Sequence, residues 1–390
     1  MMDTPSSRLD RCAGLLRRLV SVDTQNPPGN EQAMAELLLR LMDPPKENYA
    51  LIPCGPGRCS LLVTLPGRRR DKTVVLAGHM DTVPAGDPAR WSDPPLAGVR
   101  HDSKMSGRGA VDMKGGLCAM IMLYLGYHTS GSPPPCTLRF LFTADEESDG
   151  AGIRAACESG LLDDSSFLLV CEPTANRAGL CEMGTLWYRF SVHGRSCHAS
   201  MCHNGINALE CGMALTRRIL ARFDSLPPHP LLGKACAAVT RAKGGVKINI
   251  VPDFAEFEMD LRTVPIHGGT LIETENFVFR AIQRLTAEVP GLSLKAECLT
   301  RRPELEASLS HPGVQCLMRA METLDMDPAP AGVRFFTDAS IAVPMLHVPF
   351  AICGPGDPQQ CHTANETADL PQIPQTADLY ERFLDRYSQA

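Results

Sequence analysis

The chain has 390 residues, of which 44% are hydrophobic and 21% charged, and its formal net charge is -6 at pH 7. This composition is that of a folded globular protein, and the length favours two domains over one. The longest basic cluster is Arg68-Arg69-Arg70, so we expect no nucleic-acid partner. Because the sequence lacks an uninterrupted apolar run of about 18 residues, we also expect no membrane span or membrane partner.

The N-terminal stretch carries charges among its apolar positions and does not have the pattern of a signal peptide. The sixteen cysteines include no C-x-x-C pair, and most of them lie within apolar runs, where cysteine acts as a small hydrophobic residue. We therefore expect reduced thiols and a cytoplasmic protein. Cys361 lies beside His362 and is open to oxidation or to capture of a stray metal, but we predict no catalytic role for it.

The first part of the chain alternates helical and strand patterns. Helical spacing covers 8–21 and 31–42, and the turn-rich segment 24–30 between them (TQNPPGN) leads into an expected N-cap. Runs rich in β-branched residues, separated by further helical patterns, predict strands at 61–65, 73–77, 137–143 and 167–171 and helices at 113–127 and 151–159. This alternation predicts an α/β fold in which a mostly parallel mixed sheet lies between helices.

A different pattern begins after this region. The sequence predicts a half-exposed strand at 186–192, a helix at 207–223, strands around 248–251 and 255–261, and a helix at 271–288. The order β-α-β-β-α-β is typical of a ferredoxin-like α+β domain with an antiparallel sheet and two helices on one face. The α/β pattern then resumes, with a helix near 312–324 and a strand at 349–353. We predict a main domain in two parts, 1–181 and 297–390, interrupted by an inserted domain at 182–296.

Potential metal ligands follow the ends of four predicted strands. In chain order they are His79, Glu146 with Glu147, Glu172 and His362, and Asp112 stands directly before a helix. The carboxyl ends of strands in an open α/β sheet form one edge, where ligand sites are built. Two histidines and several carboxylates without cysteine are the ligand set of a hydrolytic zinc pair. Each motif alone has a plainer explanation, such as a helix cap for Asp112, but their common position favours one site.

Five segments resemble, in order, a family of zinc-dependent deacylases and exopeptidases. They are 78–84 (GHMDTVP), 107–116 (GRGAVDMKGG), 143–147 (TADEE), 172–174 (EPT) and 354–366 (GPGDPQQCHTANE). That family includes acetylornithine deacetylase, succinyl-diaminopimelate desuccinylase, aminoacylase and glutamate carboxypeptidase. The resemblance covers nearly the whole chain, and no ligand of the family pattern is missing.

The resemblance implies a pair of Zn²⁺ ions, with Co²⁺ able to substitute, bound in the main domain, which is then the catalytic domain. Asp112 is implied to bridge the ions, with His79 and Glu172 completing one site and Glu147 and His362 the other.

Two further residues of the catalytic domain are implied to act without binding metal. Glu146 is the general base that takes a proton from water and later passes it to the leaving amine. Asp81 holds the other ring nitrogen of His79 and so fixes its tautomer. The resemblance also implies a cis peptide bond between Asp112 and Met113.

The inserted domain is implied to act as a lid and as the dimerisation surface of a homodimer. His198 is implied to stabilise the oxyanion, commonly from the partner subunit, and Asn249 and Arg262 to bind substrate together with Gly354 of the main domain. Two plainer interpretations stay open: a turn-ordering role for His198 and an ordinary strand-end charge for Arg262.

The implied activity is removal of the N-acyl group from a small N-acyl amino acid, as in acetylornithine deacetylase. A dipeptidase or carboxypeptidase of the same family is the alternative, and a catalytically inactive binding protein is disfavoured because Glu146 and every ligand are present. The segment 334–338 (RFFTD) either lines the acyl pocket or contributes two phenylalanines to the core. Selection of the acyl group rests on a few side-chain contacts of about 1 to 3 kcal/mol each, so the substrate itself stays open.

Overall fold

The computed structural model describes residues 5–390, which divide into two compact units. The larger unit contains the described residues up to Leu180, together with Ala307–Ala331 and Thr337–Ala390, and the inserted unit contains Cys181–Glu306 and Gly332–Phe336. Residues 1–4, part of the N-terminal stretch that does not have the pattern of a signal peptide, lie outside the described residues. The domain boundaries at 181 and 296 stay a prediction.

The larger unit is built on a mixed sheet whose strands follow the order β1-β2-β6-β3-β7-β17-β8. The central strands β6, β3, β7 and β17 are parallel to one another, whereas β1, β2 and β8 pair with their neighbours in antiparallel orientation. The strands are β1 (Tyr49–Gly55), β2 (Arg58–Leu65), β3 (Arg69–His79), β6 (Cys136–Thr143), β7 (Phe167–Val170), β8 (Gly179–Glu182) and β17 (Phe350–Ile352). The chain passes into the inserted unit within β8.

The register of the parallel strands places their carboxyl ends side by side. His79, the last residue of β3, pairs with Thr143, the last residue of β6. In the same way Ala77 and Ile352 both pair with Val170, at the end of β7. The loops that leave these four strands therefore begin at one edge of the sheet.

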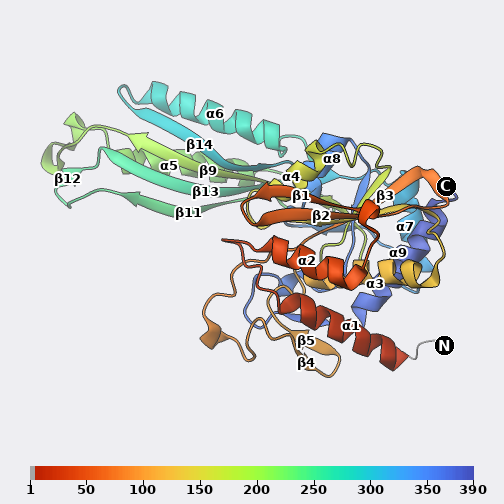
Figure 1. Ribbon diagram of the computed structural model, residues 1–390. Coiled ribbons are helices and arrows are strands. Elements are labelled where there is room, and N and C mark those ends of the chain that lie inside the picture. The colour runs from red at the N-terminus through yellow and green to blue at the C-terminus, as the bar shows by residue number, and fades with distance from the viewer. Residues whose placement is uncertain (1–4) are drawn as a thin grey trace. The chain divides into compact units, whose positions relative to one another are not determined.

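Helices cover both faces of this sheet, with α4 and α8 on one side and α1, α3, α7 and α9 on the other (Figure 1). Their bounds are α1 (Pro5–Val20), α2 (Glu31–Met42), α3 (Lys114–Ser130), α4 (Ala151–Glu158), α7 (Pro312–Glu322), α8 (Ala339–Leu346) and α9 (Gln372–Tyr387). Helix α3 is apolar on all sides because it packs against α1, α9 and β3. The core contains Leu16, Leu38, Leu117, Phe140 and Phe383, all fully buried.

Short elements complete the larger unit. A small antiparallel sheet has the strand order β18-β5-β4, and short 3-10 helices lie in the loops. The bounds are β4 (Val99–His101), β5 (Lys104–Ser106), β18 (Thr367–Asp369), η1 (Lys46–Asn48), η2 (Pro88–Arg90) and η4 (Pro358–Gln360). The short strand β16 (Ala331–Val333) pairs with β8, and its last two residues belong to the inserted unit. Among residues 5–390, no helix combines the length and apolar character needed to cross a bilayer.

Of the two helix caps that the sequence suggested, one is absent. Asp112 does not cap α3, because the N-cap position belongs to Met113 and Asp112 lies one residue earlier. Asn30 occupies the N-cap position of α2, as expected, but without a side-chain capping bond, since its side-chain amide donates to the Asp23 carbonyl oxygen. The Asp112 carboxylate is therefore directed to other partners.

The inserted unit is a four-stranded antiparallel sheet, in the order β11-β13-β9-β14, with α5 and α6 packed on it. The chain order of these elements is β-α-β-β-α-β, so the predicted fold class of the protein, α/β with an inserted α+β domain, is confirmed. Their bounds are β9 (Gly184–His193), α5 (Ala208–Asp224), β11 (Cys236–Gly244), β13 (Phe254–Thr263), α6 (Leu271–Glu288) and β14 (Ser293–Arg302), with the short β10 (Cys197–His198), η3 (Ala199–Asn204), β12 (Ile250–Val251) and β15 (Leu305–Glu306).

One strand of the inserted unit differs from the prediction. The second strand of the main sheet is β11, whereas the predicted strand near 248–251 is only the two-residue β12, which pairs with β10. β11 is an edge strand, and eight of its nine residues are exposed. It therefore lacks the apolar alternation that a half-buried strand shows, as β9 and β13 do.

Candidate metal centre

Two groups of potential metal ligands meet at the carboxyl edge of the larger unit's sheet. One consists of His79, Asp112 and Glu172, and the other of Asp112, Glu147 and His362. Within each group the ligand atoms all lie within 4.8 Å of one another. Asp112 belongs to both groups, so one carboxylate joins them.

The first group is buried. His79 Nε2 lies 3.0 Å from Asp112 Oδ1 and 3.4 Å from Glu172 Oε1. The His79 and Glu172 side chains are 1% and 4% exposed, and that of Asp112 is 13% exposed. His79 is the last residue of β3, and Glu172 follows β7 by two residues, so the sheet register alone brings them together.

The second group reaches the surface. His362 Nε2 lies 3.2 Å from Asp112 Oδ2 and 3.1 Å from Glu147 Oε2. The side chain of His362 is 54% exposed, whereas that of Glu147 is 7% exposed. His362 also lines a hollow of about 580 Å³ together with Arg90, Arg108 and Asn365. The second group is therefore open to this hollow at His362.

The loop that carries Asp112 is organised by Glu366, a residue to which the sequence analysis gave no role. Glu366 Oε1 accepts the backbone N–H groups of Val111 and Asp112 at 2.7 and 3.0 Å, and Oε2 accepts that of Gly109 at 3.0 Å. Arg108 Nη1 donates to Oε2 at 2.6 Å. Glu366 is fully buried, and the peptide bond between Asp112 and Met113 is cis, as predicted. The only sequence signal for Glu366 is its place in the segment that ends with it.

Burial and crowding shift the pKa values of this cluster in opposite directions. Burial raises the pKa of Glu172 to about 7 and also raises the pKa of Glu147. Burial would also raise the pKa of Asp112, but hydrogen bonds from His362 and His79 hold it well below its usual range. Hydrogen bonds that the His362 ring donates to Asp112 and Glu147 raise its pKa to about 10. The site therefore favours positive charge at the place where the carboxylates converge.

Glu146 is buried beside the two groups but belongs to neither. Its residue exposure is 6%, and burial, followed by the carboxylates of Glu172, Asp338 and Glu147, raises its pKa well above the ordinary value although His79 opposes the shift. Within residues 5–390 its carboxylate has no hydrogen-bond partner. It is thus a carboxylate that is ready to take up a proton.

Asp81 holds the backbone of the Glu146–Glu147 segment. Its Oδ1 accepts the N–H of Glu146 and its Oδ2 that of Glu147, both at 3.2 Å. The expected contact with His79 is longer: Nδ1 lies 3.6 Å from Asp81 Oδ1 but 2.9 Å from the Asp81 carbonyl oxygen. The nearer partner of the imidazole is therefore the main chain of Asp81.

The segment 334–338 is divided between the units. Asp338 lies in the larger unit, is 2% exposed and accepts the hydroxyl of Thr143, the last residue of β6, at 2.5 Å. Phe336 belongs to the inserted unit, where its ring packs against Trp187 and under the guanidinium groups of Arg262 and Arg302. The two aromatic residues of the segment are only partly buried.

Three residues with predicted substrate contacts lie in the inserted unit and have local partners there. His198 is exposed, and its Nδ1 lies 2.8 Å from Ser200 Oγ while it caps η3. Arg262 makes two 2.9 Å bonds to the carboxylate of Asp260. Asn249 is exposed, and its carbonyl oxygen accepts the N–H of Ala199 at 3.0 Å. The structure does not bring these three together within hydrogen-bonding distance.

Two remaining candidates lie in the larger unit. The N–H of Gly354 donates to Thr174 Oγ1 at 3.2 Å, and a Cβ at Gly354 would lie 2.2 Å from the carbonyl oxygen of Cys171. The position therefore requires glycine for the close approach of β17 and β7.

Burial raises the pKa of the Cys361 thiol well above its ordinary value, which disfavours the thiolate that would bind metal. All sixteen cysteines are free.

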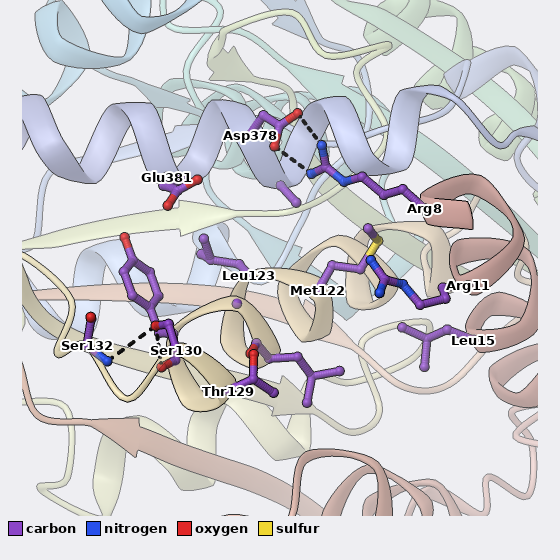
Figure 2. A pocket seen from close by; sticks show the side chains of 14 residues that line it. Arg8, Arg11, Leu15, Met122, Leu123, Thr129, Ser130, Ser132, Asp378 and Glu381 are labelled. Carbon is purple, nitrogen blue, oxygen red and sulfur yellow. Dashed lines mark hydrogen bonds and ion pairs between the residues drawn. The ribbon is translucent and has the colours of Figure 1, made fainter. Parts of the chain in front are cut away.

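A second groove of about 730 Å³ lies between α1, α3 and α9. Figure 2 shows Arg8 and Asp378 pointing toward each other, and these two side chains lie 2.5 Å apart. Leu15 and Met122 also line the groove. Neither of the two ligand groups contributes a residue to this groove. The groove is therefore separate from the candidate metal centre.

The larger unit's sheet edge, with two histidine-carboxylate groups that share an aspartate, has the arrangement of a metallohydrolase. The model of peptidase family M20/M25/M40 matches residues 75–386, and the chain belongs to that family. Members of this family are metallohydrolases that act on amide and peptide bonds.

Individual relatives are more distant. The chain is 25% identical to a probable succinyl-diaminopimelate desuccinylase of Staphylococcus epidermidis, over 96% of this chain and 95% of the relative. It is 27% identical to an acetylornithine deacetylase of Erwinia tasmaniensis, over 80% of each.

Two solved structures show the same fold. A metallo-carboxypeptidase of the family from Sulfolobus solfataricus aligns with a TM-score of 0.80 and 14% identity, over 98% of this chain and 100% of that one. A dinuclear metal-binding peptidase from Bacillus subtilis aligns with a TM-score of 0.70 and 15% identity, over 97% and 98%.

Proposed function

We propose that this protein is a dinuclear metal amidohydrolase that removes the acyl group from a small N-acyl amino acid. The observation that carries the proposal is the sharing of Asp112 by two ligand groups, one with His79 and Glu172 and one with Glu147 and His362. The proposal assigns these five residues as ligands of two metal ions, with zinc as the proposed metal.

The donor set fits a pair of divalent cations. Four carboxylates, those of Asp112, Glu146, Glu147 and Glu172, face only two histidines, and most of this charge is buried. An uncompensated cluster of buried carboxylates is costly, and two divalent ions would neutralise it. Imidazole and carboxylate ligands without a thiolate suit a catalytic zinc site with open positions. When bound, such a pair lowers the pKa of a water molecule and polarises the substrate carbonyl.

The chain's own residues supply the proton transfers. The Glu146 carboxylate is buried, has a raised pKa and has no hydrogen-bond partner within residues 5–390, so it can accept the proton of the attacking water and later donate it to the departing amine. Asp81 holds the Glu146 and Glu147 backbone N–H groups and so keeps the base and its neighbouring ligand in a fixed relation.

The inserted unit would contribute substrate contacts in this proposal. We assign His198 as the oxyanion donor and Asn249 and Arg262, with Gly354, as substrate-binding residues, because these residue types supply donors for an oxyanion and for a carboxylate. A homodimer formed through the inserted domain is part of the same proposal. We propose the cytoplasm as its location because all sixteen cysteines are free, as is usual there.

Deacylation is preferred to peptide hydrolysis because two relatives, matched over 95% and 80% of their own lengths, have the names of a desuccinylase and a deacetylase. The test is an assay of zinc-loaded and cobalt-loaded protein with N-acetylornithine, N-succinyl-diaminopimelate, other N-acyl amino acids and a dipeptide series. We expect hydrolysis of an N-acyl amino acid, lost on chelation and restored by metal. A preference for dipeptides would replace the deacylase by the peptidase alternative, and a metal-loaded protein that cleaves no amide would refute both.

A further inference from the structure

We propose that Arg58 and Glu31 are positioning residues for hydrolysis, acting through Asp145 and Asn26 on the turn that carries Glu146 and Glu147. The proposal rests on the proposed function, because it concerns the same site. Neither residue is a potential metal ligand or lies beside one in the sequence.

The guanidinium group of Arg58 joins two buried carboxylates. Its Nε donates to Glu31 Oε2 at 2.9 Å, its Nη2 donates to Glu31 Oε1, and its Nη1 donates to Asp145 Oδ1 at 2.7 Å. The side chains of Glu31 and Asp145 are 0% and 7% exposed, and that of Arg58 is 17% exposed. Removal of Arg58 would leave two buried carboxylates without their shared cation.

Three consecutive backbone N–H groups of the turn are held by carboxylates. The N–H of Asp145 donates to Glu31 Oε1 at 3.2 Å, and the N–H groups of Glu146 and Glu147 donate to Asp81 at 3.2 Å each. Asp145 has a φ of +67°, in the left-handed region that side chains seldom adopt. Such a conformation persists where surrounding contacts determine it, and here both the side chain and the N–H of Asp145 are bound to the Arg58–Glu31 pair.

Asn26 links the two ends of this network. Its side-chain amide donates to Asp81 Oδ2 at 2.9 Å and to Asp145 Oδ1 at 3.1 Å. The turn-rich segment 24–30, whose role the sequence left open beyond a loop, therefore places a donor between the two aspartates.

The same segment also places the Arg58 side chain. A Cβ at Gly29 would lie 2.7 Å from Arg58 Nε, at a φ of +77°, so only glycine allows the guanidinium group to pack this closely. Asn26, Gly29 and Glu31 thus all act on Arg58 or on its partners. The chain of contacts runs from α2 and β2 to the loop after β6.

The test compares Arg58→Met with Arg139→Met. Arg139 is a matched control because its side chain is 16% exposed, it pairs with Asp164, and it lies on β6, the strand that leads into the turn. Within residues 5–390 its guanidinium group bonds to Asp164 and to no residue of the turn. Loss of a residue that holds the groups around a metal typically costs about 10- to 100-fold in activity or metal affinity. R58M should therefore lower kcat by about that factor, with KM changed less than about 3-fold. R139M should change neither kcat nor KM.

Hydrogen exchange gives a readout that does not depend on activity. In the metal-free protein, the amides of Asp145, Glu146 and Glu147 should exchange at least about 10-fold faster in R58M than in the wild type, and at the wild-type rate in R139M. Arg58→Lys keeps the charge but lacks the planar fork, so its kcat and exchange rates should lie between those of R58M and the wild type. If R58M does not fold, the double variant Arg58→Met/Glu31→Gln, which removes two opposite charges together, takes its place.

The proposal requires both a lower kcat and faster amide exchange at 145–147 in R58M. Unchanged kcat in R58M, or a lower kcat without faster exchange at 145–147, would overturn the proposal. If the wild type cleaves no amide, the proposed function fails on that assay alone. The affinity of the metal-free variants for Co²⁺ then tests whether Arg58 positions the turn. R58M should bind Co²⁺ about 10- to 100-fold more weakly than R139M, and equal affinities would overturn the positioning role.

Discussion

The sheet edge of the larger unit and the loops of the inserted unit place their polar residues under different physical conditions. At the sheet edge, Glu146, Glu172 and His79 are buried and have shifted pKa values. In the inserted unit, His198 is exposed and bonded to Ser200, and Arg262 is bonded to Asp260. Burying unpaired carboxylates costs free energy that a merely structural cluster would avoid, so the sheet edge of the larger unit indicates a functional site. The local bonds of His198 and Arg262 in the inserted unit also occur in ordinary turns and strands.

The largest effect should come from the buried base. Replacing Glu146 by Gln keeps the size of the side chain but removes its ability to accept a proton, so kcat should fall by about 10³-fold. The metal content, measured by elemental analysis, should stay at the wild-type value because Glu146 is not assigned as a ligand. A variant that keeps more than about a tenth of the wild-type kcat would remove Glu146 from the mechanism.

The next effect tests the inserted unit. If His198 is the oxyanion donor, His198→Ala should lower kcat by about 10²-fold without loss of metal. Ser200→Ala, which removes only the local partner of the ring, serves as the control and should change kcat far less. Equal and small effects of the two substitutions would mean that His198 only orders its turn.

A smaller effect is expected at Arg262. Charge-assisted hydrogen bonds are worth about 1.5 to 3 kcal/mol, so loss of a carboxylate contact in Arg262→Ala should raise KM by about 10-fold or more with little change in kcat. The control is Arg189→Ala, because Arg189 lies in the same sheet and also pairs with a carboxylate, that of Glu258. An R262A variant with an unaltered KM would favour the ordinary ion pair with Asp260.

Lys114 provides a prediction about stability rather than activity. It is fully buried, its Nζ donates to the Val22 carbonyl oxygen at 2.9 Å, and burial lowers its pKa from 10.5 to about 7 although Glu366 opposes the shift. Between these pH values the unfolded chain binds a proton that the folded chain has released, so Lys114 makes stability rise with pH. From pH 7 to 9 the wild type should gain on the order of 2 kcal/mol relative to Lys114→Met.

Urea unfolding at pH 7, 8 and 9 measures the difference in the free energy of unfolding between the wild type and K114M. The contributions of other titrating groups largely cancel in this difference. Parallel stability curves for the wild type and K114M would show that Lys114 keeps its proton in the folded protein.

Much of the sheet-edge site was predictable because its signals are local. An apolar run predicts where a strand ends, and the parallel strands then bring His79, Glu147 and Glu172 to one edge. Contacts between polar residues far apart in sequence carry no such signal. Arg58 meets Glu31 over 27 positions and Asp145 over 87, and no periodicity in the sequence indicates these pairs.

The structure differs from the prediction at Asp112 and at β11 because a sequence pattern reports only local features. Asp112 lies directly before a predicted helix, as an N-cap residue would, but α3 begins one residue later than predicted and the backbone N–H of Asp112 donates to Glu366. β11 was missed because an exposed edge strand has no buried face to produce alternation. Both depend on tertiary surroundings rather than on local propensity.

The central claim is that one shared aspartate joins two metal sites, and metal stoichiometry tests it most directly. Protein saturated with zinc and freed of excess metal should contain about two ions per chain. Asp112→Ala should retain fewer than one, because both groups lose a ligand, while the Glu146→Gln control should retain two. One ion per chain in the wild type, or two in D112A, would contradict the shared dinuclear site.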